Sequence, residues 1–547
     1  MTLRPHLLWQ RLAVVMAVAM IAAVAVALRT VRLEDRPVHP DEANQAWKLG
    51  ELLETGAYRY DPHDHHGPAL YYLAWPLVRL QSGGVFAASA MAFYRLTPAL
   101  FGVALAMMAL AAARPLGPTA ALAAAALTAL SPAMVVYSRF FIHEMLLVAF
   151  TFGLVLSVWR HAVAPTWRSA AAAGLSLGLM QSTKETWLVA VAALALAVAA
   201  TVPPRELRRH LAAHVGHILL GLGVAAAVSL LFYSSFGTNP RGPLDAWTAY
   251  ATYLGRGVAA DATAHRHPVG WYLGLLIGRP AGVGVRDGEV LILLLGLTGL
   301  LAAWRRPVVP GAAAVARRAL GLFAVVLTAA YSLLPYKTPW CLLSFWHAWI
   351  LLAGIGAAIL LETLPRPLPR LLAGLLLAAG AVGLGRDAWL AATRDAAHPR
   401  HPYAYAQTSR AFLDLVRRLE ELRQATPAGE ALTVFIMAPA EDTWPLPWYL
   451  RHHTHAGWWT DLDPAAVQAR PAVLITTPEL AQGLPADWND NYLQEYHGLR
   501  PGVLLVASIR RDHWARWLAR HAQGTARTAP DSPQAEGPRR HQREIAD

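Results

Sequence analysis

Long apolar runs separated by short polar segments dominate residues 8–385. The first run, residues 8–28, has the length of about 20 residues that a helix needs to cross a bilayer. A signal peptide would have a shorter apolar core and a small-residue cleavage site, so we predict a retained transmembrane helix. Residues 68–80 are shorter and contain Pro76 and Arg79, which is typical of an interfacial or re-entrant helix.

Ten further apolar windows of roughly membrane length follow the first one. They lie at residues 92–113, 118–137, 141–159, 168–183, 186–201, 212–234, 288–304, 319–335, 340–361 and 368–385. Together with the first run they predict an all-α polytopic protein with about eleven transmembrane helices over residues 1–385.

The C-terminal part of the chain has a different pattern. Short apolar runs at residues 432–437, 472–476 and 503–509 predict strands, and residues 411–423 and 513–520 have helical periodicity. We therefore predict a small extracytoplasmic α/β domain over residues 386–525. Residues 526–547 are polar and poor in apolar side chains, which predicts a disordered tail.

The composition agrees with a membrane protein. Of 547 residues, 55% are hydrophobic and only 15% are charged, and the mean hydropathy is +0.34. The single cysteine, Cys341, lies in an apolar run, so the sequence offers neither a disulfide framework nor a cysteine metal site.

The distribution of arginines predicts the orientation. When alternate sides are traced from a cytoplasmic N-terminus, the cytoplasmic segments hold fourteen basic and two acidic residues, whereas residues 29–67 hold five basic and eight acidic residues. This bias follows the positive-inside rule and predicts a multi-pass protein of the inner (plasma) membrane. The difference, 14 − 2 = +12, equals the net charge of the chain, so no nucleic-acid partner is needed to explain it.

The first outer segment, residues 38–72, contains far more polar chemistry than a connecting loop needs. It carries His39, Asp41, Glu42, Asp61, His63, Asp64, His65 and His66. Asp41 and Glu42 follow Pro40 at the start of a predicted amphipathic helix, where the helix dipole keeps a carboxylate ionised and suits it to act as a base. The alternative is an acidic pair that only caps an interfacial helix.

Cations are predicted on the same face. Arg139, Lys184 and Lys337 lie at junctions between apolar runs, and charges at such positions are costly unless they are used or paired. Cations for phosphate oxygens and a carboxylate for an acceptor hydroxyl would form a bipartite site. The alternative is that the lysines extend to the membrane interface, with Tyr336 and Trp340 as aromatic-belt residues.

The histidines of the first outer segment suggest a second chemistry. His63, His65 and His66, with Asp61, have the ligand types that bind a divalent cation. Their spacing matches no standard metal signature, so histidines that form hydrogen bonds or serve the structure are the alternative.

Several motifs carry a resemblance to a known superfamily. At HPDEA (39–43), HGPALYYLAWPL (66–77) and SRFFIHE (138–144), the chain resembles the GT-C membrane glycosyltransferases, in particular the protein O-mannosyltransferase and aminoarabinose transferase group. YKTPW (336–340), HPYAYAQTSR (401–410) and WPLPWYLR (444–451) are similar to a prokaryotic branch described as flippase-activity-associated. The likeness covers most of residues 1–460.

The resemblance implies a polyprenyl-phosphate-linked sugar as the donor and a catalytic aspartate in the first outer loop. Asp41 matches this aspartate, and Glu42 is its predicted catalytic partner. Arg139, Lys184 and Lys337 are expected to contact the donor phosphate. The residues expected to bind the substrates are His65, His66, Tyr71, Glu144, Glu185, Tyr336 and Trp340.

We therefore expect inverting sugar transfer to an acceptor hydroxyl on the extracytoplasmic face, with membrane lipid as a further partner. A lipid-linked sugar flippase and a non-catalytic membrane assembly partner are the alternatives. A transporter usually places polar groups near the middle of the membrane. Here the middle positions of the apolar runs are nearly all Ala, Leu, Val and Gly, which favours the enzyme.

Overall fold

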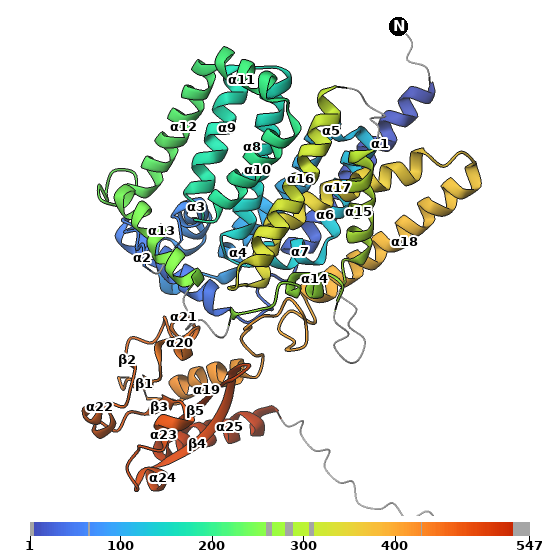
Figure 1. Cartoon of the computed structure of the whole chain (residues 1–547). Helices are drawn as coiled ribbons and strands as arrows, with labels where there is room; N and C mark the ends of the chain where they lie inside the picture. The colour runs from blue at the N-terminus through green and yellow to red at the C-terminus, as the bar shows by residue number, and fades with distance from the viewer. Residues whose placement is uncertain are drawn as a thin grey trace, which may run out of the picture. The chain divides into compact units, whose positions relative to one another are not determined.

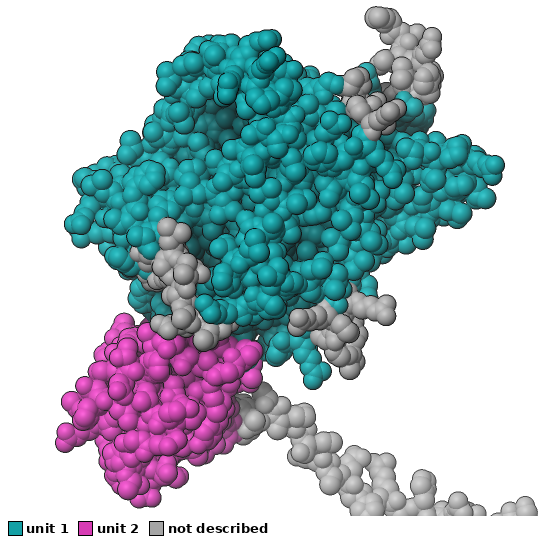
Figure 2. Space-filling view, in the orientation of Figure 1, with its two compact units in different colours: residues 1–410, 444–451 teal, residues 411–443, 452–547 magenta. Residues whose placement is uncertain are grey.

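The computed structural model describes residues 5–63, 66–258, 265–278, 288–305, 311–427 and 429–528. The chain divides into a helical unit, residues 1–410 and 444–451, and a C-terminal unit, residues 411–443 and 452–547 (Figure 2). The division follows residue 410, whereas the sequence predicted a boundary at 386. The segment before 410 belongs to the helical unit because Gln407 and Thr408 donate hydrogen bonds to the carbonyls of Pro37 and Val38, at 2.9 and 2.6 Å.

The helical unit is built from helices throughout (Figure 1). Its elements are α1 (Pro5–Thr30), α2 (Pro40–Thr55), α3 (Ala69–Ser82), η1 (Phe86–Ala88), α4 (Met91–Met108), η2 (Ala109–Ala112), α5 (Ala113–Leu116), α6 (Pro118–Leu130), α7 (Pro132–Ser138), α8 (Glu144–Val163), α9 (Trp167–Gln181), α10 (Trp187–Thr201), α11 (Pro204–Ala213), α12 (Val215–Tyr233), α13 (Gly242–Val258), α14 (Trp271–Leu276), α15 (Val290–Trp304), α16 (Ala312–Leu333), η4 (Pro339–Leu342), α17 (Leu343–Glu362), α18 (Pro367–Ala392) and α21 (Leu446–Tyr449).

The chain is a multi-pass membrane protein, but the predicted number of eleven crossings is not confirmed. Among the described residues, seven helices are long and apolar enough to cross a membrane, or nine if each of two bent helix pairs is one span. The predicted windows at 168–183 and 288–304 became α9 and α15, which have 15 residues each. At 1.5 Å per residue, such a helix is about 22 Å long, shorter than the ~30 Å apolar layer of a bilayer.

Helix α17 lies at the centre of the helical unit. In the span that includes it, 89% of an 18-residue apolar window is buried inside the protein, against 6% for the span of α18. Glycines allow this dense packing, because a Cβ at Gly299 or Gly356 would lie 1.9 or 2.1 Å from a backbone oxygen of the facing helix. Helices α15 and α17 therefore pack backbone against backbone, as small residues permit in membranes.

The two ends of the helical unit differ. Figure 1 shows the short helices α2 and α14 at one end and α5 and α11 at the other. Helix α11 carries Arg205, Arg208 and Arg209 and has no buried residue. The segment predicted as an interfacial or re-entrant helix, residues 68–80, is helical as α3. We call the end with α2 the α2 end and the end with α11 the arginine-rich end.

The C-terminal unit is a mixed sheet with helices, as predicted. Its elements are α19 (Phe412–Ala425), β1 (Val434–Met437), α20 (Ala440–Thr443), β2 (Ala456–Trp459), α22 (Pro464–Gln468), β3 (Val473–Thr476), α23 (Pro478–Ala481), α24 (Trp488–Asn491), β4 (Tyr492–Arg500), β5 (Val503–Arg510) and α25 (Arg511–Thr528). The strand order is β2-β1-β3-β5-β4, in which β1 pairs in parallel with β2 and β3, while β5 is antiparallel to β3 and β4.

The three predicted strands are β1, β3 and β5, which occupy the centre of this sheet. The edge strands β2 and β4 were not predicted. Strand β2 has only four residues, and β4 interrupts its apolar positions with polar side chains. Helix α25 extends to Thr528, and the rest of the predicted tail lies outside the described residues.

Candidate active site

The start of α2 is held by a reciprocal cap. The N-cap residue His39 accepts a hydrogen bond from the Asp41 N–H at Nδ1, at 3.1 Å, and the Glu42 carboxylate accepts one from the His39 N–H, also at 3.1 Å. Pro40 occupies the first turn, where its missing N–H is no loss. Because Nδ1 of His39 accepts, the proton of the neutral ring is on Nε2, which donates to the Tyr405 carbonyl at 3.0 Å.

Glu42 lies at the centre of a buried ion cluster. Its side chain is fully buried and accepts from Arg36 at 2.8 Å, from Arg95 at 2.8 Å through both carboxylate oxygens, and from the Phe141 N–H at 3.0 Å. Burial alone would raise the pKa of Glu42, but the charges and hydrogen bonds of Arg36 and Arg95 outweigh it and lower the pKa to about 2. We call Glu42, Arg36 and Arg95 the Glu42 cluster.

The Glu42 cluster joins four segments of the helical unit. Arg36 also donates to the carbonyl of Arg139 at 2.9 Å, and Arg95, from α4, donates to the carbonyl of Leu33 at 2.6 Å. Every oxygen of the Glu42 carboxylate is therefore engaged. This geometry fits a positioning residue, in contrast to the catalytic role expected from the sequence.

Asp41, the next residue, has a different environment. Its side chain is 46% exposed, and its carboxylate lies 3.9 Å from Nδ1 of His39. The negative charge of Asp41 acts on the side chains of His265, Tyr336 and Tyr405, which come from three separate segments of the chain. We call these four residues, Asp41, His265, Tyr336 and Tyr405, the Asp41 recess.

The aromatic and imidazole rings near Asp41 contact one another. The Tyr405 hydroxyl lies 2.8 Å from Nδ1 of His265 and 3.2 Å from Nε2 of His267, and the Trp340 ring packs edge-on against His39 at 5.6 Å. Burial, reinforced by the Asp41 charge, raises the pKa of Tyr405 to about 12, and burial lowers the pKa of His265. The hydroxyl of Tyr405 thus stays protonated and His265 stays neutral at physiological pH.

Lys337 holds the segment of His265 and His267 against the chain before α17. The Lys337 ammonium donates to the carbonyl of His267 at 2.9 Å and to that of Leu334. The backbone N–H of Lys337 donates to the His265 carbonyl at 2.9 Å. A β-bridge joins Arg266 to Tyr336 in the same place. The Lys337 side chain is only 1% exposed, and two of its three ammonium N–H groups are used in these hydrogen bonds.

The second lysine, Lys184, forms a buried ion pair with Glu144 at the start of α8. Burial alone would lower the pKa of Lys184, but the Glu144 charge outweighs it and the pKa is raised well above its usual value. Glu144 is the one hydrogen-bond acceptor of the Lys184 ammonium among the described residues. The other two ammonium N–H groups have no acceptor among the described residues, and the side chain is buried.

Tyr336 connects the two predicted halves of the site. Its side chain is 41% exposed, and both the Asp41 carboxylate and the Lys184 ammonium act electrostatically on its hydroxyl. Burial of the hydroxyl, with the Asp41 charge, raises the pKa of Tyr336 to about 12. Tyr336 is linked to the start of α2 by its ring contact with His265 at 5.0 Å and by the hydrogen bonds of Tyr405 with His265 and His39.

The HGPALYY motif packs against the loop that carries Lys184. A Cβ on Gly67 would lie 2.3 Å from the Ser182 carbonyl, which accepts a hydrogen bond from the Ala69 N–H at 2.8 Å. This close approach needs glycine and places His66 beside Glu185, with His66 Nδ1 2.7 Å from the Glu185 carboxylate.

Two other predicted site residues have structural partners. The buried Tyr71 hydroxyl donates to Gln45 of α2, which fastens α3 to α2. Arg139 donates to the carbonyls of Leu28 at 3.1 Å and Arg32 at 3.0 Å, next to the Glu42 cluster. Burial lowers the pKa of Arg139 to about 10, which leaves it charged at neutral pH.

The described residues contain no group of three or more His, Cys, Asp or Glu side chains that would hold a metal ion. The Asp61 carboxylate accepts a hydrogen bond from the His63 N–H at 2.8 Å, and His66 contacts Glu185. His65 lies outside the described residues, so the metal site predicted from these histidines stays a prediction.

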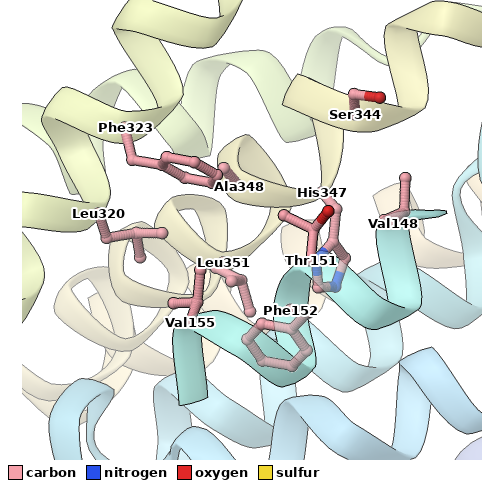
Figure 3. Close-up of a pocket in the computed structure, with 10 residues that line it drawn as sticks. All are labelled: Val148, Thr151, Phe152, Val155, Leu320, Phe323, Ser344, His347, Ala348 and Leu351. Atoms are coloured by element: carbon pink, nitrogen blue, oxygen red, sulfur yellow. The ribbon is translucent and has the colours of Figure 1, made fainter. Parts of the chain in front are cut away.

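A cavity lies within the helical unit between α8, α16 and α17 (Figure 3). Its volume is about 20 Å³, which admits about one water-sized group and cannot hold a prenyl chain. The polar side chains at its wall are Thr151, Ser344 and His347, and Ser344 accepts a hydrogen bond from Tyr331 at 3.2 Å.

The sequence analysis missed several residues that build the site. Arg36, Arg95 and Tyr405 were not selected, although a charged residue such as Arg95 within an apolar run was a usable signal. The pairing of Arg95 with Glu42 and of Tyr405 with His265 joins residues that are 53 and 140 positions apart, which no local pattern shows.

Known proteins share this fold. Residues 56–238 match the sequence model of the dolichyl-phosphate-mannose-protein mannosyltransferase family. The structure resembles ArnT from Cupriavidus metallidurans in the apo state, with a TM-score of 0.61, 16% identity and coverage of 91% of this chain and 98% of that chain. It resembles the same protein bound to undecaprenyl phosphate, with a TM-score of 0.62, 17% identity and coverage of 90% and 97%.

A third similar structure is the archaeal oligosaccharyltransferase AglB from Archaeoglobus fulgidus in complex with an inhibitory peptide and a dolichol-phosphate. Its TM-score is 0.52 at 14% identity, with coverage of 91% of this chain and 74% of that chain. No curated protein matches the sequence of this chain. The branch predicted within the superfamily stays a prediction. The chain is thus similar to the dolichyl-phosphate-mannose-protein mannosyltransferase family over residues 56–238, and its fold is similar to those of ArnT and AglB.

Proposed function

We propose that the chain transfers a sugar from a polyprenyl-phosphate donor to an acceptor hydroxyl at the α2 end of the helical unit. The main support is the Asp41 recess, where a half-exposed carboxylate lies beside the His39 cap, and His39 is linked by Tyr405 to His265 and His267. The donor class is supported by the undecaprenyl phosphate bound to ArnT and the dolichol-phosphate bound to AglB, two proteins that share the fold.

In the proposed reaction Asp41 is the general base. Its carboxylate takes the proton of the acceptor hydroxyl as that oxygen forms a bond to the anomeric carbon, while the bond from the anomeric carbon to the phosphate oxygen breaks. One displacement inverts the configuration. The exposure of Asp41 supports this role, because a base must reach its substrate, whereas every oxygen of Glu42 is engaged.

The leaving group is a phosphate that departs as an anion, so fixed cations stabilise it and no strong general acid is required. We assign this role to Lys184 and Lys337, because each has an ammonium N–H group without an acceptor among the described residues. Arg139 instead holds the carbonyls of Leu28 and Arg32, so we assign it a positioning role together with Glu42.

The rings of Tyr336 and Trp340, with Glu185 and His66 nearby on the lysine side, would contact the sugar or the acceptor. Tyr336 is the substrate contact best supported, because its side chain is 41% exposed and its ring contacts His265 of the Asp41 recess. The Tyr336 hydroxyl stays protonated at neutral pH, so it can donate a hydrogen bond to a sugar oxygen.

The test is sugar transfer in proteoliposomes that contain a labelled polyprenyl-phosphate sugar. Asp41→Asn should reduce transfer by about 10²–10⁴-fold, the usual loss on removing a general base. The matched control is Glu51→Gln on the same helix, whose carboxylate is 43% exposed and pairs with Lys48. Undiminished transfer by Asp41→Asn would remove Asp41 from the mechanism. Lipid movement without transfer by the unaltered protein would favour a flippase, and neither activity would favour an assembly partner.

A further inference from the structure

A large cavity lies at the other end of the helical unit. Its volume is about 760 Å³, and it is enclosed by the residues around α5, the C-terminal half of α8 and the start of α9. Helix α8 runs from Glu144 at the proposed active site to Val163 in this cavity. Its 20 residues separate the two sites by about 28 Å, so the cavity is not part of the Asp41 recess.

The charged side chains that line this cavity are all cations, and none has a counter-charge among the lining residues. Arg114, Arg160 and Arg168 line it, and no Asp or Glu does. All three arginines are exposed, and none forms an ion pair within the part of the chain that the structure describes. We call these three residues the arginine triad.

Two further features favour an anion in this cavity. The indole N–H of Trp159, one of its lining residues, is buried without an acceptor among the described residues. Thr166 and Ser169 cap the start of α9, a 15-residue helix whose N-terminal end also lines the cavity. The N-terminus of a helix carries a partial positive charge, which adds to the field of the arginine triad.

Apolar residues complete the wall. Leu110, Ala111 and Val163 line the same cavity, which is located where helices of membrane length end. A ligand that fits both surfaces has a phosphate group and an apolar part next to it. Basic pockets between membrane helices bind anionic lipid headgroups for this reason.

We propose that this cavity binds the headgroup of an anionic phospholipid, with its phosphate held by the arginine triad and the Trp159 indole N–H. The site is separate from the donor site of the proposed function and does not depend on it. Its ligand is a resident lipid of the arginine-rich end, which the charge bias predicts to face the cytoplasm.

Native mass spectrometry of the full-length protein in detergent tests the proposal, with phosphatidylglycerol as the anionic lipid and phosphatidylcholine as the zwitterionic lipid. The protein should retain phosphatidylglycerol in preference. The triple variant Arg114→Gln, Arg160→Gln, Arg168→Gln should lose this retention by about tenfold or more, because each arginine supplies charge-assisted hydrogen bonds to the phosphate.

The matched control is the triple variant Arg205→Gln, Arg208→Gln, Arg209→Gln on α11. It removes the same charge from the same end of the helical unit, but these exposed residues do not line the cavity. Unchanged retention in the control supports a built site. An equal loss in both variants would reduce the effect to general attraction between cations and anionic lipid, and would overturn the proposal.

Two more measurements test the same site with single variants, in case the triple variant fails to fold. Trp159→Phe keeps the ring but removes the N–H, and should lower retention by about twofold to fivefold, since one neutral donor is lost. Unchanged retention in this variant, together with unchanged retention in Arg160→Gln alone, would overturn the proposal. Binding of inorganic pyrophosphate to lipid-free protein that abolishes phospholipid retention and needs the arginine triad would assign the site to a soluble polyphosphate instead.

Discussion

The Glu42 cluster and the Asp41 recess begin at adjacent residues of one helix, yet they place two carboxylates in opposite environments. Glu42 is fully buried and accepts hydrogen bonds from two arginines and two backbone N–H groups, whereas the Asp41 side chain is 46% exposed. Successive side chains of a helix point about 100° apart, so Glu42 is buried while Asp41 is half exposed. The comparison shows how a buried ion cluster can fix the start of a helix while the neighbouring carboxylate, the proposed base, stays half exposed.

The strongest test of this contrast is Glu42→Gln. This change leaves Arg36 and Arg95 buried without their counter-charge, which should lower the free energy of unfolding by about 3–5 kcal/mol. Thermal unfolding of the detergent-solubilised protein, followed by tryptophan fluorescence, would measure the loss. Asp41→Asn is the control and should leave the stability within about 0.5 kcal/mol, because its side chain is half exposed. An equal loss of unfolding free energy in Glu42→Gln and Asp41→Asn would contradict the difference in environment between the two carboxylates.

Low pH should remove the stability that the ionised Glu42 carboxylate contributes to the Glu42 cluster. The pKa of Glu42 in the folded protein is about 2, below its usual 4.5, so its contribution to stability is complete above pH 4.5 and is lost as the pH falls through about 2. The contribution amounts to about 3 kcal/mol. The difference in stability between the unaltered protein and Glu42→Gln should shrink over this window. A difference that stays constant from pH 6 to pH 2 would contradict the assignment.

The lysine side of the site provides a third comparison. Lys184→Met should lower the free energy of unfolding by about 2–3 kcal/mol, because Glu144 is then left buried without its cation. The double variant Lys184→Met, Glu144→Gln should recover part of this loss, since no unpaired charge remains. Stability measured without donor separates this effect from phosphate binding. Strictly additive losses would mean that the two side chains do not form a working pair.

The smallest change in unfolding free energy is expected at the exposed ion pair of α2, between Lys48 and Glu51. Glu51→Gln should change the free energy of unfolding by at most about 1 kcal/mol, because Glu51 is 43% exposed and water screens its pair with Lys48. Measured beside Glu42→Gln under the same conditions, this variant shows whether burial, rather than the mere presence of an ion pair, sets the cost. A loss as large as that of Glu42→Gln would contradict this explanation.

Much of the site could be predicted because its residues stand out against an apolar background. Asp41, Lys184 and Lys337 were selected since a charge at the end of an apolar run is costly unless it is used. Their roles were harder to predict. Glu42 and Asp41 are indistinguishable in sequence, because the arginines that separate them come from residues 36 and 95. Arg139 was selected as a phosphate ligand, although it is engaged by two backbone carbonyls.

The sequence by itself determined the division into apolar helices and a C-terminal α/β unit, because burial in lipid and the repeats of helices and strands leave a local record in the chain. It also determined the central strands β1, β3 and β5, which are apolar runs. Only the tertiary structure decided which helices are too short to cross alone, and which of two neighbouring carboxylates is open. The openness of Asp41 and the burial of Glu42 depend on contacts between separate segments, such as the ion pair of Glu42 with Arg95 on α4, and such contacts leave no periodic signal.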